Sequence, residues 1–140
     1  MTKHKPKIII VGAGLSGLTL ALSLAQSNFD IVVLEQASQL SEVGAGIQIS
    51  ANGARVLHLL GLESELAKVA FRPEQGEMRH WKTGETLISR PLGKTSVERF
   101  GFPYYHMHRY DFHRLLETAT RAAAPNAIRL QARADTTKQN

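Results

Sequence analysis

The segment KIIIVGAGLSGLTLALSLAQ, at residues 7–26, constrains the fold of this chain more than any other feature. A short apolar run leads into Gly12, Gly14 and Gly17, which have the G-x-G-x-x-G spacing, and a second apolar run follows them. In such a turn the first glycine allows the bend, the second lets the backbone approach a pyrophosphate, and the third lets helix and strand pack closely. The segment therefore predicts a strand, a nucleotide-binding turn and a helix.

A secretory signal is the main alternative, because a basic start precedes an apolar run with small residues near its end. Three glycines would each cost an apolar helix about 1 kcal/mol relative to alanine, so a signal has no reason to carry them. The next segment, FDIVVLEQ, is typical of a second buried strand and ends near Glu35. A dinucleotide fold places an acid about 20 residues after its glycines, where it accepts hydrogen bonds from the adenosine ribose. We therefore favour the nucleotide-binding interpretation.

Length and composition limit the remaining function classes. A chain of 140 residues fits one domain, and 43% hydrophobic residues, 21% charged residues and no cysteine are typical of a soluble cytoplasmic protein without disulfides. No apolar stretch lacking glycine is long enough to span a bilayer, which argues against a membrane role. The net charge of +5 could indicate nucleic-acid binding, but the arginines between Arg55 and Arg133 are spread singly. We expect a solvated basic surface and no nucleic-acid partner.

The rest of the chain predicts helices and an antiparallel layer. Ser50 or Asn52 starts a helix that stops at Gly61 and is followed by a second short helix. Val56, Leu57 and Leu60 are expected to form the buried face of the first of these helices. The KTGE turn, with Gly84, predicts a hairpin that begins a second, antiparallel β layer beside a three-layer α/β core.

Toward the C-terminus the pattern becomes less regular. Residues 91–103 are rich in turn formers and predict an irregular loop, and YYHMH predicts a short extended segment. A helix capped by Asp111 should follow, then a strand over AIRLQARA and a disordered tail at 135–140.

The histidines raise the question of a metal site. His106 and His108 alternate on the extended segment, with His113 and Glu117 nearby in the next helix. Neither cysteines nor a second carboxylate cluster supports them, so we expect packing or surface roles and no metal.

Four segments together resemble the N-terminal part of the FAD-dependent aromatic-ring monooxygenases, the family that contains salicylate hydroxylase and 3-hydroxybenzoate 6-hydroxylase. These segments are IIIVGAGLSGLTLALSL, VVLEQA, GAGIQISANGARVLHLLGL and HRYDFHRLL. The resemblance implies an α/β, Rossmann-like FAD/NAD(P)-binding fold over residues 1–134, incomplete relative to the family. It also implies FAD as cofactor and, in the full-length family, NADH or NADPH as co-substrate and a small hydroxybenzoate-like aromatic substrate.

The resemblance also implies roles for individual residues. The backbone from Gly12 to Gly17, with Gly14, Leu15 and Ser16, would cradle the FAD pyrophosphate at a helix N-terminus. Glu35, followed by Gln36, would hold the adenosine ribose, and its charge would disfavour a 2′-phosphate. Arg109 would contact the phosphate-ribityl region of FAD. Gly46 and Ile47 would lie in a loop that runs alongside the flavin ring. Gln48 would face the flavin or the substrate. No catalytic residue is assigned.

The sequence departs from the family in its final segment. The Asp-Gly and Gly-Asp segments of the family are absent, and ARADTTKQN leaves the family pattern where a strand should continue. We therefore expect a truncated FAD-binding portion of an aromatic hydroxylase that is inactive by itself. A stand-alone nucleotide-binding module and a small NAD-dependent reductase remain alternatives, although no tyrosine is followed by a lysine at the Tyr-x-x-x-Lys spacing.

Overall fold

A computed structural model describes residues 6–41 and 44–139 of the chain. The chain divides into two compact units. The terminal unit comprises residues 1–43 and 110–140, and the central unit comprises residues 44–109. The glycine turn and Glu35 therefore belong to the terminal unit, whereas Gly46 and Arg109 belong to the central unit.

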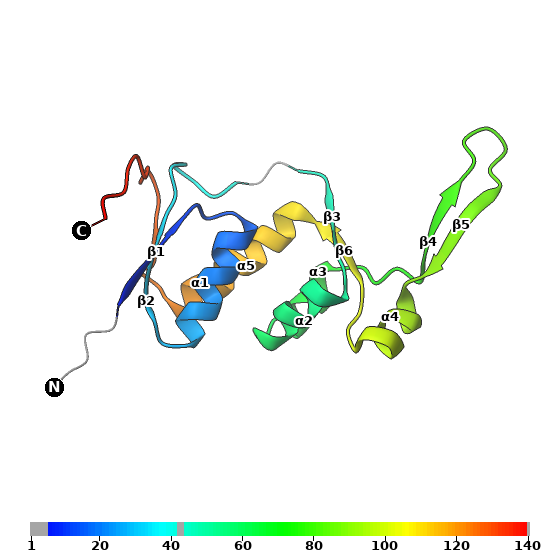
Figure 1. The fold of residues 1–140 in the computed structure, drawn as a ribbon, viewed down its shortest axis with the longest axis horizontal. Helices are drawn as coiled ribbons and strands as arrows, with labels where there is room; N and C mark the ends of the chain where they lie inside the picture. The colour runs from blue at the N-terminus through cyan, green and yellow to red at the C-terminus, as the bar shows by residue number, and fades with distance from the viewer. Residues whose placement is uncertain (1–5, 42–43, 140) are drawn as a thin grey trace. The chain divides into compact units, whose positions relative to one another are not determined.

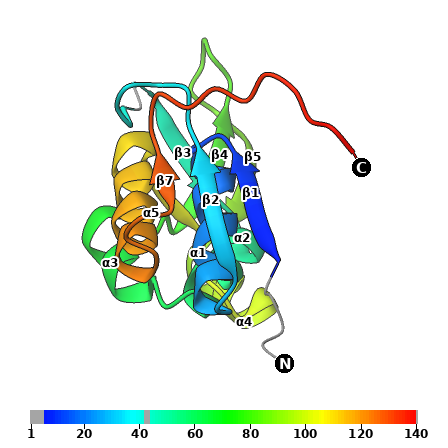
Figure 2. The ribbon, with the colours of Figure 1, turned by 90° about the vertical axis from the view of Figure 1, so that its left-hand side faces the viewer.

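The terminal unit is built on a parallel sheet of three strands in the order β1-β2-β7. These strands are β1 (Lys7–Val11), β2 (Asp30–Leu34) and β7 (Ile128–Arg129). Helix α1 (Leu15–Gln26) connects the first two, and α5 (Arg109–Ala123) contributes its residues from 110 onward. Figures 1 and 2 show both helices on the same face of the sheet. The predicted Rossmann-like strands and crossover helix are confirmed.

The face of β1 that points away from the helices is exposed in the described part of the chain. Ile10 is 6% exposed and packs on the helix side, where α1 contributes Leu18 and Leu22 to the core. Ile9 and Val11 point to the opposite face and are 61% and 67% exposed, although they are as apolar as Ile10. The described residues thus form two of the three layers that the sequence predicts.

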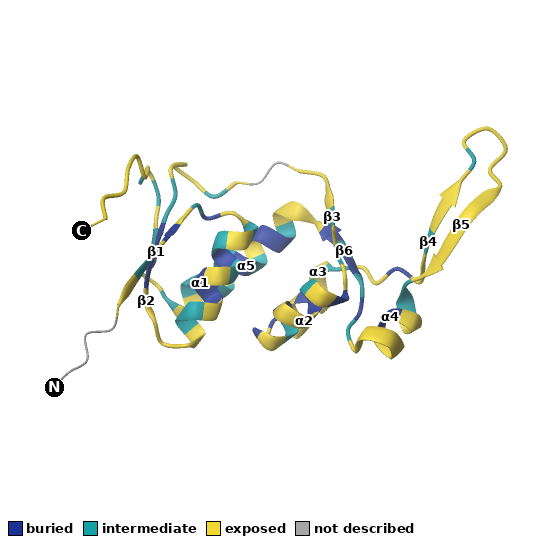
Figure 3. Cartoon of the chain, viewed as in Figure 1, coloured by how far each residue is buried: buried dark blue, intermediate teal, exposed yellow. Residues whose placement is uncertain are grey.

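The central unit consists of two antiparallel strand pairs and three helices. One pair joins β3 (Gly46–Ile49) to β6 (Tyr105–His108), and the other is the hairpin of β4 (Gln75–Arg79) and β5 (Thr86–Pro91). Its helices are α2 (Ala51–Leu59), α3 (Glu63–Val69) and α4 (Gly93–Phe100). Gly84 lies in the hairpin turn with φ of +73°, as the KTGE motif predicts. Figure 3 shows that the hairpin is almost entirely exposed.

Several local predictions were wrong. The expected loop at 91–103 contains α4, which ends at Gly101 in the left-handed conformation with φ of +78°. Val56 is 46% exposed, whereas Leu57 and Leu60 are buried. Asp111 lies in the first turn of α5 rather than at its cap, because the helix begins at Arg109.

The C-terminal segment forms less regular structure than predicted. Of the strand expected over 127–134, only β7 pairs with β2. Residues 135–139 form no helix or strand, and Asn140 lies outside the described residues. No helix in the described ranges is long and apolar enough to cross a membrane.

Candidate nucleotide-binding site

The glycine turn between β1 and α1 is shaped by two steric requirements. Gly12 has φ of +94°, a conformation that side chains with a Cβ rarely adopt, and its N–H donates to the Leu34 carbonyl oxygen at 2.7 Å. A Cβ on Gly17 would lie 2.0 Å from the Gly12 carbonyl oxygen. The close approach of helix and strand therefore requires glycine at 17, as the motif predicts.

Gly14 has neither the positive φ of Gly12 nor the close backbone contact of Gly17. Its backbone is extended, with φ of −72° and ψ of −178°, and a Cβ placed on it would find no atom within 4 Å. It is the N-cap of α1, yet no side chain caps the helix and no acidic residue lies in the first turn. The first N–H groups of a helix have no partner within the helix, and the helix dipole favours an anion there. The turn therefore fits a pyrophosphate approaching the open side of Gly14, Leu15 and Ser16.

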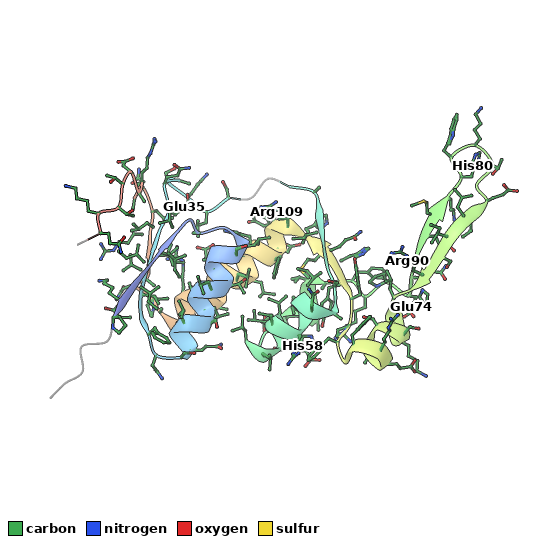
Figure 4. All side chains as sticks on the ribbon, in the orientation of Figure 1. Glu35, His58, Glu74, His80, Arg90 and Arg109 are labelled. Carbon is green, nitrogen blue, oxygen red and sulfur yellow. The ribbon has the colours of Figure 1, made fainter. Side chains whose placement is uncertain are left out.

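Glu35 follows β2 and binds the glycine turn through its carboxylate (Figure 4). Its Oε2 accepts a hydrogen bond from the Ala13 N–H at 2.8 Å, and its Oε1 accepts one from the Ala37 N–H at 2.9 Å. The N–H groups of Ala37 and Ala13 lower the pKa of the Glu35 carboxyl below its ordinary value, against the opposing effect of partial burial. Because each carboxylate oxygen accepts more than one hydrogen bond, Glu35 keeps capacity for a ribose hydroxyl.

His113 of α5 holds the same turn from the other side. Its Nε2 lies 2.8 Å from the Ala13 carbonyl oxygen, and the side chain is 3% exposed. Since a carbonyl only accepts, this nitrogen carries the proton and donates. Both peptide groups that flank Ala13 are thus fixed, one by Glu35 and one by His113. The sequence placed His113 only in a packing or surface role, because its partner lies 100 residues away in the chain.

A cavity of about 320 Å³ opens beside Glu35 and Gln36. Its other walls are the ends of β1 and β2 and residues 132–134, which the sequence did not identify as part of a site. The Ala132 N–H donates to the Glu35 carbonyl oxygen at 2.9 Å and so brings this segment to the end of β2. Arg133 lines the cavity and pairs with Asp135 at 3.0 Å, with its side chain 76% exposed.

The remaining predicted residues lie in the central unit. Gly46 pairs with His108 and Ile47 pairs with Met107 across the β3–β6 ladder. Arg109 follows β6 directly, and a Cβ on Gly44 would lie 3.4 Å from its Cδ (Figure 4).

Gln48, the next residue of β3, makes a side-chain contact within the same unit. Its Oε1 accepts a hydrogen bond from the Tyr104 hydroxyl at 3.0 Å. The structure therefore brings the predicted residues of β3 to the chain segment that precedes α5.

The histidines have no metal-binding arrangement within residues 6–41 and 44–139. No group of three His, Cys, Asp or Glu side chains there is placed to hold a metal ion. His106 lies opposite Gln48 in the β3–β6 ladder, whereas His113 is occupied by the Ala13 carbonyl.

Known proteins are similar to this chain in sequence and, over the matched part, in fold. A family model described as an NAD(P)-binding Rossmann-like domain matches residues 10–61. 3-Amino-4-hydroxybenzoate 2-monooxygenase from Streptomyces platensis is 43% identical over 116 residues, which are 83% of this chain and 29% of that enzyme. 3-Hydroxybenzoate 6-hydroxylase from Aquipseudomonas alcaligenes is 38% identical over 80% of this chain and 28% of its own length. The chain thus spans less than a third of either relative.

Solved structures give the same result for the fold. The tetrameric form of 2-methyl-3-hydroxypyridine-5-carboxylic acid oxygenase superposes with a TM-score of 0.78 at 26% identity. The superposition covers 92% of this chain and 32% of that one. Together with the sequence matches, it shows that this chain is homologous to the FAD-binding N-terminal part of flavoprotein aromatic hydroxylases.

Proposed function

We propose that the chain binds the adenosine diphosphate part of FAD and serves as the cofactor-binding portion of an NAD(P)H-dependent aromatic hydroxylase. One observation carries the proposal. The start of α1 presents uncapped N–H groups beside Gly14, where a Cβ would meet no atom within 4 Å, while the fold itself requires glycine at 12 through its positive φ and at 17 through the close Gly12 carbonyl. A middle glycine that no steric or conformational need of the fold explains, beside free helix N–H groups, is suited to the approach of a pyrophosphate.

Each part of the nucleotide has candidate contacts in the terminal unit. The N–H groups of Leu15 and Ser16 would bind the pyrophosphate, and Gly12 and Gly17 would keep the turn in place. Glu35 would accept hydrogen bonds from the adenosine ribose, and its negative charge favours FAD or NAD over a 2′-phosphorylated nucleotide. The cavity beside Gln36 and Arg133 would take the adenine.

The central-unit residues have proposed roles toward the rest of the cofactor. Arg109 would bind the phosphate-ribityl region through its fork of donors, and Gly46 and Ile47 would border the flavin. Gln48 would face flavin or substrate. When bound, the flavin supplies the redox chemistry, and the protein contributes binding, orientation and electrostatics. The hydroxybenzoate substrates in the names of the relatives support a small aromatic substrate for the whole enzyme.

A titration of the 140-residue chain with ADP, FAD and NAD tests this function. We expect ADP to bind and to compete with FAD, since the proposed contacts lie on the nucleotide end. Gly14→Val should weaken both ligands at least about tenfold by blocking the open side of the turn. Equal affinity of Gly14→Val and the natural chain would refute the site. Tighter binding of NAD than of FAD would favour the small NAD-dependent reductase instead.

We also expect the chain by itself to hydroxylate no aromatic compound. The proposed contacts hold the adenosine end of the cofactor, and hydroxylation needs a reactive ring shielded from water. Mass spectrometry of a reaction with FAD, NADH or NADPH and 3-hydroxybenzoate measures this directly. Substrate-dependent formation of a hydroxylated product would contradict the expectation.

A further inference from the structure

The hairpin of β4 and β5 has open edges. In the described part of the chain these two strands pair only with each other. Every residue of β5 is exposed, and so is every residue of β4 except the half-buried Gly76 (Figure 3). A sheet of two strands is marginally stable in water, and three or more strands are usually needed. The hairpin is therefore suited to gain a strand from outside itself.

The two edges of the hairpin are not equally open to pairing. Met78 lies opposite Ile88 and Arg79 lies opposite Thr86, so Leu87 is an extra residue that makes a bulge in β5. Strand β5 also ends in a proline, which has no N–H to donate. Bulges and prolines protect the edges of sheets from pairing. Because both features lie on β5, the open edge of β4 is the candidate interface.

The hydrogen bonds of the hairpin show which backbone groups of β4 point outward. The carbonyl oxygen of Glu74 and the N–H of His80 both bond to the β5 side of the hairpin, at 2.9 and 2.8 Å. Residues of an antiparallel strand face the two sides alternately, so the even-numbered residues of β4 face β5. The residues whose N–H and C=O groups face the open edge are Gln75, Glu77 and Arg79.

The side chains at this edge are complementary to a second copy of the same edge. The Glu77 carboxylate accepts hydrogen bonds from Gln75 Nε2 at 2.9 Å and from Arg79 Nε at 2.7 Å, so the three side chains share one face of the strand. If two copies of β4 pair antiparallel about a two-fold axis at Met78, each Glu77 lies directly opposite Arg79 of the other copy. An axis at Glu77 would instead bring the two carboxylates together. Opposite charges across a ladder are stabilising and like charges are destabilising, so the axis at Met78 is favoured.

The same register joins the apolar side chains of the two hairpins. Met78 and Ile88 lie opposite each other and are 59% and 44% exposed. With the axis at Met78, these two residues and their counterparts form one apolar row across four strands. We propose that this chain forms a symmetric dimer by pairing the open edges of β4, with Met78 at the two-fold axis and Glu77 opposite Arg79.

Charge reversal tests the pairing, by sedimentation equilibrium of the 140-residue chain at low salt. The natural chain should form reversible dimers. Glu77→Lys and Arg79→Glu should each weaken its dimer at least about tenfold, because each sets like charges opposite each other. An equimolar mixture of the two variants should restore the affinity, because every pair is then of opposite sign.

General attraction between the two variants would not explain this recovery. The natural chain has a net charge of +5, and each substitution changes the charge by two, so both variants stay positive. A monomeric natural chain, or a mixture that associates no more tightly than either variant alone, overturns the proposal.

Single cysteines test the register independently, because the natural chain has no cysteine. Residues that face each other without exchanging hydrogen bonds have Cα atoms about 4.5 Å apart, within the range that a disulfide spans. Met78→Cys should therefore form disulfide-linked dimers. Ser89→Cys is the matched control, because copies of the exposed Ser89 would be separated by three strand spacings, or about 14 Å.

Non-reducing gel electrophoresis after mild oxidation measures the two rates. Met78→Cys should form linked dimers at least about tenfold faster than Ser89→Cys. Equal rates would mean association through another surface, such as the exposed face of β1, and would contradict the proposed dimer.

Discussion

The candidate nucleotide site of the terminal unit and a cavity of about 590 Å³ in the central unit are built in different ways. In the terminal unit the site is built from backbone: a glycine turn, the start of α1, and peptide groups held by Glu35 and His113. In the central unit the cavity is built from side chains, with arginines and aromatic rings on its walls. The first kind depends on how closely two backbones approach, so single added atoms should disturb it most. The second depends on charge and shape, so it should tolerate changes that keep both.

The largest effect is expected at Gly17. Gly17→Ala places a Cβ 2.0 Å from a backbone oxygen that cannot move without shifting the turn. We expect a loss of about 3 kcal/mol or more in the free energy of unfolding, measured by urea denaturation with circular dichroism. Gly14→Ala is the matched control, because its Cβ meets no atom within 4 Å, and it should cost no more than the loss of a good N-cap residue, about 1 kcal/mol. Equal destabilisation of the two variants would contradict the distinction between a structural and a ligand-facing glycine.

His113 should come next in magnitude. His113→Leu removes the donor to the Ala13 carbonyl in a buried position, and an unsatisfied buried acceptor costs about 1–3 kcal/mol. His113→Gln keeps an N–H donor and should recover part of the loss. Thermal unfolding and ADP titration of both variants would check this, and an ADP affinity unaffected by the Leu variant would show that the turn does not need the contact.

The Glu35 carboxylate should make the stability of the fold depend on pH. The hydrogen bonds from Ala37 and Ala13 lower the pKa of its carboxyl from the ordinary value of 4.5, so the folded state favours the ionised form. Its contribution to stability should be fully present above about pH 4.5 and should be lost as the pH falls through the lowered pKa. The difference in unfolding free energy between the natural chain and Glu35→Gln should therefore be constant near neutral pH and shrink in acid. A difference that grows on acidification would have the wrong sign.

The smallest effect is expected in the central unit. Tyr104→Phe removes one partly solvated hydrogen bond to Gln48 but keeps the ring on the cavity wall. We expect less than about 1 kcal/mol of destabilisation, measured by urea denaturation with circular dichroism. A loss of several kcal/mol would show that the hydroxyl, rather than the packing of the ring, stabilises this unit.

Features that depend on a short stretch of chain could be predicted from the sequence, whereas features that depend on distant residues could not. The β1–α1–β2 crossover could be predicted because its signals lie within one short segment. Gly12 is needed for its positive φ, and Gly17 is needed because a side chain there would clash with the Gly12 carbonyl. Helix α4 was missed because Gly93, Thr95 and Ser96 resemble turn formers. Gly101 after Phe100 was the available signal, since a left-handed glycine commonly ends a helix.

Contacts between distant segments were also beyond prediction. The hydrogen bond of His113 to Ala13 joins α5 to the glycine turn, 100 residues earlier in the chain. The exposure of Val56 depends on which neighbours pack against its helix. The lining of the adenine cavity by residues 132–134 required the chain to return beside Glu35, which no local pattern encodes.

The uncovered face of β1 has a colloidal consequence. Ile9 and Val11 offer apolar surface through which two copies can attract each other at short range, while the net charge of +5 makes the copies repel. At about 0.1 M salt the repulsion extends only about 10 Å, and further salt shortens it without weakening the apolar attraction. Light scattering should therefore report growing self-association of this chain as sodium chloride is added, and replacing Ile9 and Val11 by threonine should suppress it.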